Sequence, residues 1–186
     1  YIQSCERVQY LFPKAHAVAY VLMAYRIAYC KVHHPKHFYA SYFTVRATDF
    51  DYTHVSKGSH YIKNFIKSVY QQGFRASVLD KSIATYLELA NEMIERGYEF
   101  EKVDLYKSHP TKFLITEKGL RPPLASLAGV GNNAALSIAE ARDVNNPFIS
   151  REDLRQRAGI GKAVIERLAD VGVLDDLPES NQIDLF

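Results

Sequence analysis

Cysteine is scarce in this sequence, and long apolar runs are missing. The two cysteines, Cys5 and Cys30, are too few for a disulfide framework, so we expect both to be reduced in a cytoplasmic protein. The apolar run over residues 17–25 is far shorter than the roughly 20 residues of a membrane span, so it predicts a buried helix and no membrane partner. The sequence opens on Tyr1 instead of methionine, and we therefore expect a piece of a longer chain.

Familiar catalytic signatures are missing too. The sequence contains no Walker-type phosphate loop, no nucleophile elbow and no exonuclease-like set of carboxylates. Three histidines, His33, His34 and His37, could suggest a metal site, but Pro35 breaks their helical spacing and no cysteine or carboxylate cluster accompanies them. We interpret them as a surface or DNA-proximal cluster and expect no metal ligands in this sequence.

What the sequence does have is the composition of a globular protein. It is 47% hydrophobic and 24% charged, which is enough apolar material for a sizeable core. The net charge is only +2, but it is spread unevenly. Residues 1–118 hold 16 Lys and Arg against 11 Asp and Glu, whereas residues 119–186 hold 7 against 10. If the second part touches nucleic acid, we expect local geometry to do the binding instead of a broad basic field.

Periodicity predicts a mainly α fold with a small β element (α+β). The expected helices cover residues 14–32, 36–46, 60–72 and 80–96, with Gly73 and Gly97 at the ends of the last two. Residues 48–59 are expected to be a loop, and the expected short strands cover residues 103–106 and 112–116. Pro122 and Pro123 suggest a boundary near residues 118–122.

Two turns of the form glycine, apolar residue, glycine follow this boundary. They are 30 residues apart, which predicts a tandem repeat of short helical units; their residues are Gly129-Val130-Gly131 and Gly159-Ile160-Gly161. Together with Leu124, Leu127 and Ala134, the first turn resembles a helix-hairpin-helix motif. Glycines allow unusual backbone angles and leave room for a phosphate, which the next helix meets with its N-terminal amides.

These turns are expected to bind duplex DNA through its backbone, without reading sequence. The predicted DNA-binding residues are those of the two turns with the residues that follow them: Gly129, Val130, Gly131, Asn132, Asn133, Gly159, Ile160, Gly161 and Lys162. By analogy with the motif, a monovalent cation at a turn is possible. The alternative is that the glycines only allow tight packing between helices.

The segment around the first expected helix carries a more specific resemblance. Residues 12–20 (Phe-Pro-Lys-Ala-His-Ala-Val-Ala-Tyr), with Tyr25, Tyr29 and Lys31 downstream, resemble the fingers of bacterial family C replicative DNA polymerases, and within them the PolC-type DNA polymerase III alpha subunit. The resemblance extends along the chain and is also strong over residues 103–133 and 177–186.

The resemblance implies that Lys14, His16 and Tyr20 face the incoming deoxynucleoside triphosphate. His16 and Tyr20 are four residues apart, which places them on one helical face. The alternative is that both are core residues. The resemblance also implies that Mg²⁺ is held by palm carboxylates that this chain lacks, so the Asp49-Phe50-Asp51 segment, which follows the fingers helix, is not interpreted as catalytic and the chain alone is expected to be inactive.

The last residues resemble a peptide that binds the sliding clamp. In Gln182-Ile183-Asp184-Leu185-Phe186, the final pair would enter an apolar pocket while Gln182 sets the register by hydrogen bonds. The predicted clamp-binding residues are Gln182, Ile183, Leu185 and Phe186. The alternative is that Leu185 and Phe186 pack on their own domain.

The resemblance gives a layout of four parts. Residues 1–46 would end the fingers, residues 47–118 would form a mixed α/β connector, residues 119–176 a tandem helix-hairpin-helix duplex-binding domain, and residues 177–186 a flexible tail with the clamp peptide. The expected partners are primer-template duplex, deoxynucleoside triphosphate and the sliding clamp, in a cytoplasmic, nucleoid-associated protein. Two alternatives stay open: a stand-alone helix-hairpin-helix module of a repair or recombination complex, and a clamp adaptor without a DNA role.

Overall fold

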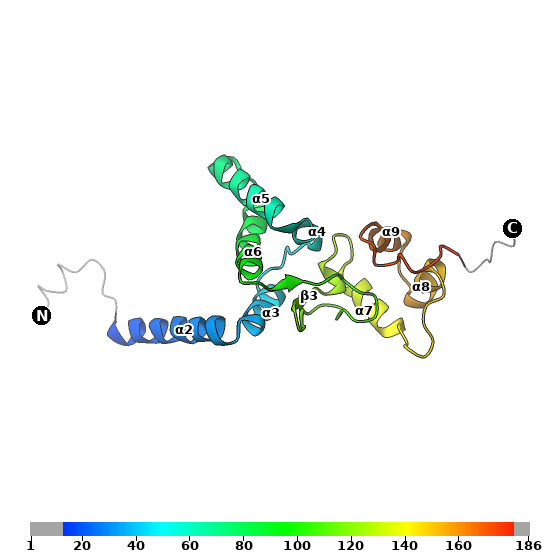
Figure 1. The fold of residues 1–186 in the computed structure, drawn as a ribbon, viewed down its shortest axis with the longest axis horizontal. Helices are drawn as coiled ribbons and strands as arrows, with labels where there is room; N and C mark the ends of the chain where they lie inside the picture. Colours follow the sequence, from blue (N-terminus) through cyan, green and yellow to red (C-terminus); the bar gives the residue numbers. More distant parts are fainter. Residues whose placement is uncertain (1–12, 181–186) are drawn as a thin grey trace, which may run out of the picture. The chain divides into compact units, whose positions relative to one another are not determined.

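The computed structural model describes residues 13–180 and confirms a mainly α fold with one small sheet (Figure 1). One compact unit ends at Phe38, and the second begins at Tyr39. The α-helices are α2 (Lys14–His33), α3 (Pro35–Val45), α4 (Tyr52–Val55), α5 (Gly58–Gln72), α6 (Val78–Glu95), α7 (Asn132–Ala141), α8 (Arg151–Ala158) and α9 (Lys162–Asp170). Two 3₁₀ turns, η1 (Gly73–Arg75) and η2 (Leu124–Ser126), connect longer elements.

Helix α2 begins after Pro13, as the sequence predicts, but its predicted burial is wrong for the described part of the chain. None of its residues is buried, and apolar side chains such as Val21 (68% exposed) and Tyr25 (69%) face outward. The physical reason is that the described part of its unit contains, besides α2, no other helix or strand than the start of α3. No helix in the described residues is long and apolar enough to cross a membrane.

Three short strands form the sheet, in the order β1 (Glu99–Phe100), β3 (Gly119–Arg121), β2 (Leu114–Ile115). Strand β3 is central, parallel to β1 and antiparallel to β2. It occupies the segment where the sequence suggested a boundary. A Cβ atom on Gly119 would lie 2.1 Å from the Glu99 carbonyl oxygen, so only glycine allows β1 to approach this closely.

The predicted strand over residues 103–106 is wrong. Its backbone is instead turned by Asp104, whose Oδ1 accepts hydrogen bonds from the N–H groups of Tyr106 (2.9 Å) and Lys107 (2.7 Å). Such a local side-chain bond competes with strand pairing. The expected loop over residues 48–59 is also only partly right, because Asp51 caps the short helix α4 by accepting a hydrogen bond from the Thr53 N–H (2.8 Å).

An aromatic core holds the second unit together around the sheet. Phe43 packs edge-to-face on Phe50 (5.5 Å between centroids), and Phe50 packs on Tyr86 (5.0 Å) and Phe113 (4.9 Å). Tyr39 and Phe43 are buried in this core. Aromatic pairs of this kind contribute about 0.5–1.5 kcal/mol each beyond their burial, so the segment that precedes the hairpins is firmly attached to the sheet.

Candidate nucleic-acid interface

The two glycine turns repeat one another in backbone conformation. The first glycine of each is left-handed, with φ of 87° at Gly129 and 62° at Gly159. The second glycine of each is extended and caps the next helix, with φ and ψ of −69° and 163° at Gly131 and −74° and 158° at Gly161. The sequence repeat is therefore also a structural repeat.

Side chains in the two turns divide in the same way between core and solvent. The apolar middle residues are buried, with Val130 3% and Ile160 8% exposed. The second glycines are exposed, and a Cβ atom added at Gly131 or Gly161 would meet no protein atom within 4 Å. The apolar residue anchors each turn, while its outer edge leaves the backbone accessible to a ligand.

Each turn leads directly into a helix whose first amides face the turn. The Gly131 carbonyl accepts the Ala135 N–H (3.0 Å), and the Gly161 carbonyl accepts the Ile165 N–H (3.4 Å). Neither helix has a side-chain hydrogen bond at its N-cap. The first amides of a helix have no partner within it and carry partial positive charge, so both turns present donors suited to a phosphate.

The elements that lead into the turns differ. The second turn follows a true helix, α8, which Ser150 begins by accepting the Asp153 N–H (3.0 Å). The first follows only the 3₁₀ turn η2, which comes directly after Pro123. Ser126 stabilises η2 because its buried hydroxyl donates to the Pro123 carbonyl (2.6 Å). The first hairpin therefore has a short 3₁₀ turn in place of its leading α-helix.

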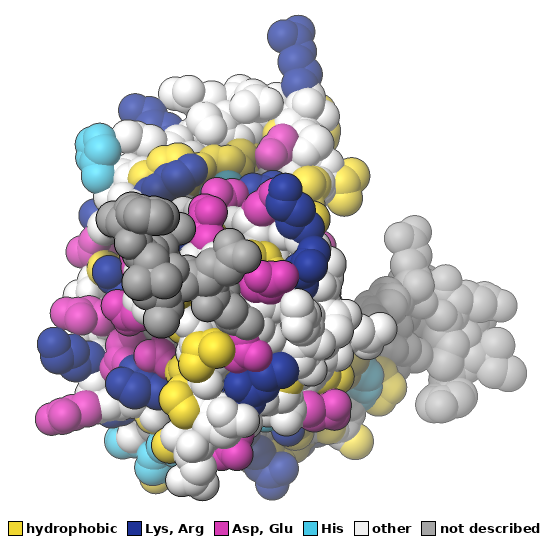
Figure 2. Space-filling model, turned by 90° about the vertical axis from the view of Figure 1, so that its right-hand side faces the viewer, with side chains coloured by type: hydrophobic (Ala, Val, Ile, Leu, Met, Phe, Trp, Pro, Cys, Tyr) yellow, Lys and Arg dark blue, Asp and Glu magenta, His cyan; other side chains and the backbone are white. Residues whose placement is uncertain are grey.

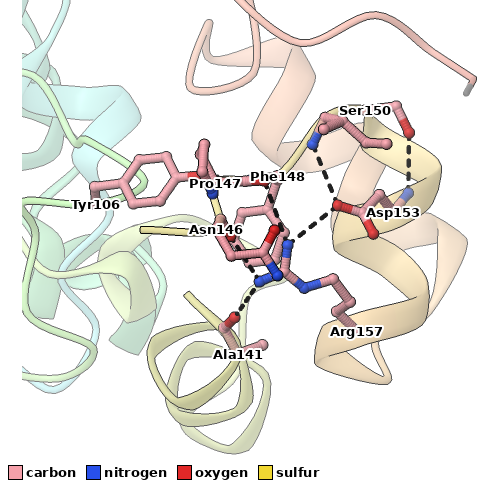
Figure 3. A network of polar contacts seen from close by, with 9 residues as sticks. Tyr106, Ala141, Asn146, Pro147, Phe148, Ser150, Asp153 and Arg157 are labelled. Carbon is pink, nitrogen blue, oxygen red and sulfur yellow. Dashed lines mark hydrogen bonds and ion pairs between the residues drawn. The ribbon is translucent and has the colours of Figure 1, made fainter. Parts of the chain in front are cut away.

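Arg157 joins the two hairpin units at one point (Figure 3). From α8 its guanidinium donates to three backbone carbonyls at and after the end of α7: those of Ala141 (3.0 Å), Asn146 (2.9 Å) and Pro147 (3.4 Å). It also pairs with Asp153 (3.2 Å) and lies 4.4 Å from the Phe148 ring centroid. No sequence motif predicts this role, because the acceptors are backbone atoms.

A second arginine attaches the hairpins to the preceding turn. Arg142, just after α7, donates to the carbonyls of Leu105 (3.1 Å) and Ser108 (2.7 Å). The Tyr106 hydroxyl accepts the Phe148 N–H (2.7 Å) from the other direction. The hairpins are thus fixed to the Asp104 turn by several hydrogen bonds.

Charge near the turns is mixed. Figure 2 shows Lys and Arg side chains interspersed with Asp and Glu side chains on the face that it draws. Lys162, next to the second turn, is 80% exposed and lies 3.6 Å from Glu166, a weak pair at the surface. With Arg151 and Arg155 it lines a groove of about 610 Å³. The first turn borders a groove of about 470 Å³ whose lining includes Asp49 and Asp51.

Comparisons with known proteins agree with this geometry. Residues 97–183 match the family described as the helix-hairpin-helix motif, which covers both turns. All 186 residues align with curated proteins named DNA polymerase III PolC-type, at 54% identity in Bacillus cereus, 55% in Caldanaerobacter subterraneus and 51% in Bacillus subtilis. The chain belongs to the PolC-type DNA polymerase III family. It spans about 13% of the length of each of these relatives.

In this PolC-type chain, the predicted nucleotide-binding residues lie together at the start of α2. The rings of His16 and Tyr20 contact each other at 4.4 Å between centroids, as their spacing predicts, and Tyr20 is 65% exposed. Lys14 is the first residue of the helix and is exposed. The alternative that His16 and Tyr20 are core residues of this chain is not supported, since both are exposed; their binding of a nucleotide stays a prediction.

The carboxylates after α3 have structural partners. Asp49 accepts a hydrogen bond from the Ser82 hydroxyl (2.6 Å), while Asp51 caps α4. Among the described residues, no three His, Cys, Asp or Glu side chains gather to hold a metal ion. A monovalent cation at a hairpin turn stays a prediction.

The PolC-type tail is anchored where it leaves the second hairpin. The carbonyls of Pro178 and Glu179 accept hydrogen bonds from the N–H groups of Arg151 (2.8 Å) and Glu152 (3.2 Å) at the start of α8. The Arg151 side chain also donates to the Leu177 carbonyl (3.1 Å). The predicted clamp-binding residues, Gln182, Ile183, Leu185 and Phe186, lie outside the described residues.

Proposed function

We propose that this chain holds primer-template duplex by its phosphate backbone within a replicative DNA polymerase. The observation that carries the proposal is the repeated turn, in which a buried apolar residue fixes a glycine whose outer side is open. Such a pair of backbone sites, one on each hairpin, suits two phosphates and carries no base-reading side chain. Binding should therefore depend on salt and not on sequence.

The activity of the whole polymerase is part of the same proposal. It would add a deoxynucleotide to a primer 3′ end and release pyrophosphate, with Mg²⁺ supplying charge stabilisation on carboxylates outside this chain. Here, Lys14, His16 and Tyr20 would contact the incoming nucleotide, and the end of the tail would bind the sliding clamp. We propose that the chain alone does not extend a primer.

The PolC relatives favour this function over a stand-alone helix-hairpin-helix module. A repair or recombination module would account for residues 97–183, which match the motif. It would not account for α2, which lies within the 186 residues that align with the polymerases. The clamp adaptor without a DNA role leaves the two open turns unexplained.

The test uses glycines that the fold itself does not require. Gly131 and Gly161 have ordinary φ values and open space around a Cβ, so Gly131→Ser and Gly161→Ser should fold. Serine is also a good N-cap, so stability should stay equal or rise by a few tenths of a kcal/mol. The new side chain would occupy the amides and the space for a phosphate, so duplex affinity should fall by about tenfold in the double variant, or about 1.4 kcal/mol.

Fluorescence anisotropy with a labelled blunt duplex measures the affinity, and urea unfolding measures the stability. Gln71→Ser, on the exposed surface of α5, is the control and should change neither affinity nor specificity. Unchanged duplex affinity in the double glycine variant would contradict the proposal. So would a clear preference for one duplex sequence.

A further inference from the structure

The first glycine turn has no cation of its own. Residues 127–133 read Leu-Ala-Gly-Val-Gly-Asn-Asn, whereas the second turn is followed at once by Lys162. Backbone amides alone give a phosphate site only partial charge compensation, since the helix N-terminus carries about half an elementary charge. A full cation near the first turn therefore has to come from elsewhere in the fold.

Arg167 of α9 lies over this turn. A Cβ atom built on Gly129 would lie 3.2 Å from Arg167 Cγ and 3.5 Å from its Nε. The missing side chain at Gly129 therefore has two effects. It allows a left-handed φ of 87°, and it leaves room for Arg167 of the second hairpin. Motif spacing does not predict this contact, since 38 positions separate residues 129 and 167 in the sequence.

The guanidinium of Arg167 is accessible to a ligand and only weakly paired within the protein. Its side chain is 58% exposed, and its ion pair with Asp170 is long, at 3.7 Å, with the carboxylate 65% exposed. Exposed pairs of this kind contribute little and exchange readily for a stronger partner. A phosphodiester is such a partner, because arginine offers it a planar fork of donors.

We propose that Arg167 supplies the cation for the phosphate at the first turn. In this arrangement, one phosphodiester of the duplex is held by the first amides of α7 and by the guanidinium of α9, and Lys162 serves the second turn. The second hairpin, which contains α9, then provides the cation for both turns. This proposal rests on the proposed duplex binding and adds a residue that the helix-hairpin-helix pattern does not contain.

Arg167→Gln in the whole chain separates a binding role from a packing role. Glutamine keeps much of the aliphatic stem over Gly129 and removes the charge. We expect duplex affinity to fall about five- to tenfold. The slope of log affinity against log salt should become shallower by about one, which corresponds to the loss of one phosphate contact. Arg167→Lys, which keeps the charge and loses the fork, should restore the slope and part of the affinity. Lys67→Gln, a charge removed from the exposed surface of α5, should change the slope little.

A double-variant comparison assigns Arg167 to one of the two turns. Combined with Gly131→Ser, Arg167→Gln should lower affinity much less than the product of the two single losses, because both changes disturb one phosphate. Combined with Gly161→Ser, the losses should multiply. An Arg167→Gln chain with an unchanged salt slope, or losses that multiply equally with both glycine variants, would overturn the inference while the glycine results stand. A wild-type chain without salt-dependent duplex binding would instead overturn the proposed function.

Discussion

At the scale of single residues, the segment that follows the Asp104 turn depends on a neutral histidine. His109 Nδ1 accepts hydrogen bonds from the Thr111 and Lys112 N–H groups, both at 3.0 Å, so this nitrogen must be unprotonated. Burial lowers the pKa of His109, and the positive charges of Lys112 and Arg142 lower it further. Since the folded state binds this proton less readily than the unfolded state, stability is highest above the ordinary histidine pKa and falls as the pH drops through it.

Replacing His109 by asparagine should reduce this pH dependence. An asparagine oxygen can accept from N–H groups two and three residues ahead and does not titrate. We expect the free energy of unfolding of the wild-type chain, measured in urea, to decrease between about pH 7.5 and pH 5.5, and the decrease to be smaller in His109→Asn. Part of it should remain, because burial also lowers the pKa of His54. An equal decrease in both chains would show that His109 does not carry this proton linkage.

At the scale of elements, the relation of α7 to α8 depends on Arg157. A lysine at this position keeps the charge but cannot donate in a planar fork to the carbonyls of Ala141, Asn146 and Pro147 at once. The Arg157 side chain is only 25% exposed, so carbonyl groups that lose its N–H donors would be incompletely hydrated. We expect Arg157→Lys to lower the free energy of unfolding by about 1–3 kcal/mol.

The control for Arg157→Lys is Arg155→Lys, on the exposed side of the same helix. It should change stability by less than about 0.5 kcal/mol. Urea unfolding followed by circular dichroism measures both variants. Equal stability of the Arg157→Lys and wild-type chains would mean that the bonds to the α7–α8 connection contribute nothing net to the fold.

Local sequence signals predict elements whose cause is local. Helix α5 ends at Gly73, where φ is 53°, and α2 begins after Pro13, as expected from residues next to those ends. The turns were also predictable, because two glycines around an apolar residue specify a backbone. Strands β1 and β3 were not, since each has only two or three residues and forms by pairing with distant partners.

The same distinction applies to the candidate site. Gly131 and Gly161 can be predicted from the motif. Arg157, which donates to backbone carbonyls, and Arg167, which lies beside Gly129 of the first hairpin, cannot, because only the fold creates these contacts. The predicted burial of α2 failed for a related reason. Its apolar residues indicate a covered helix, but the described part of its compact unit contains no partner that covers it.

At the scale of the whole molecule, the chain is anchored to the second hairpin only a few residues before the predicted clamp-binding segment. Because the Pro178 and Glu179 carbonyls are bound at the start of α8, only a short segment separates the hairpin from Gln182. Burial of Leu185 and Phe186 in a clamp groove could contribute on the order of 3–5 kcal/mol before ordering costs, which is weak binding alone. A clamp that encircles the same duplex would meet the peptide at high effective concentration.

We therefore expect the clamp and the duplex to bind this chain cooperatively through two separate sites. Leu185→Ala with Phe186→Ala should abolish clamp binding and leave affinity for a short duplex unchanged within about twofold, since the hairpins do not contain these residues. Gly131→Ser with Gly161→Ser should give the opposite result: clamp affinity would be retained without DNA, and the gain from a clamp-loaded duplex would be lost. Surface plasmon resonance on immobilised clamp measures both arms, and an alanine variant with wild-type clamp affinity would refute the role of the tail.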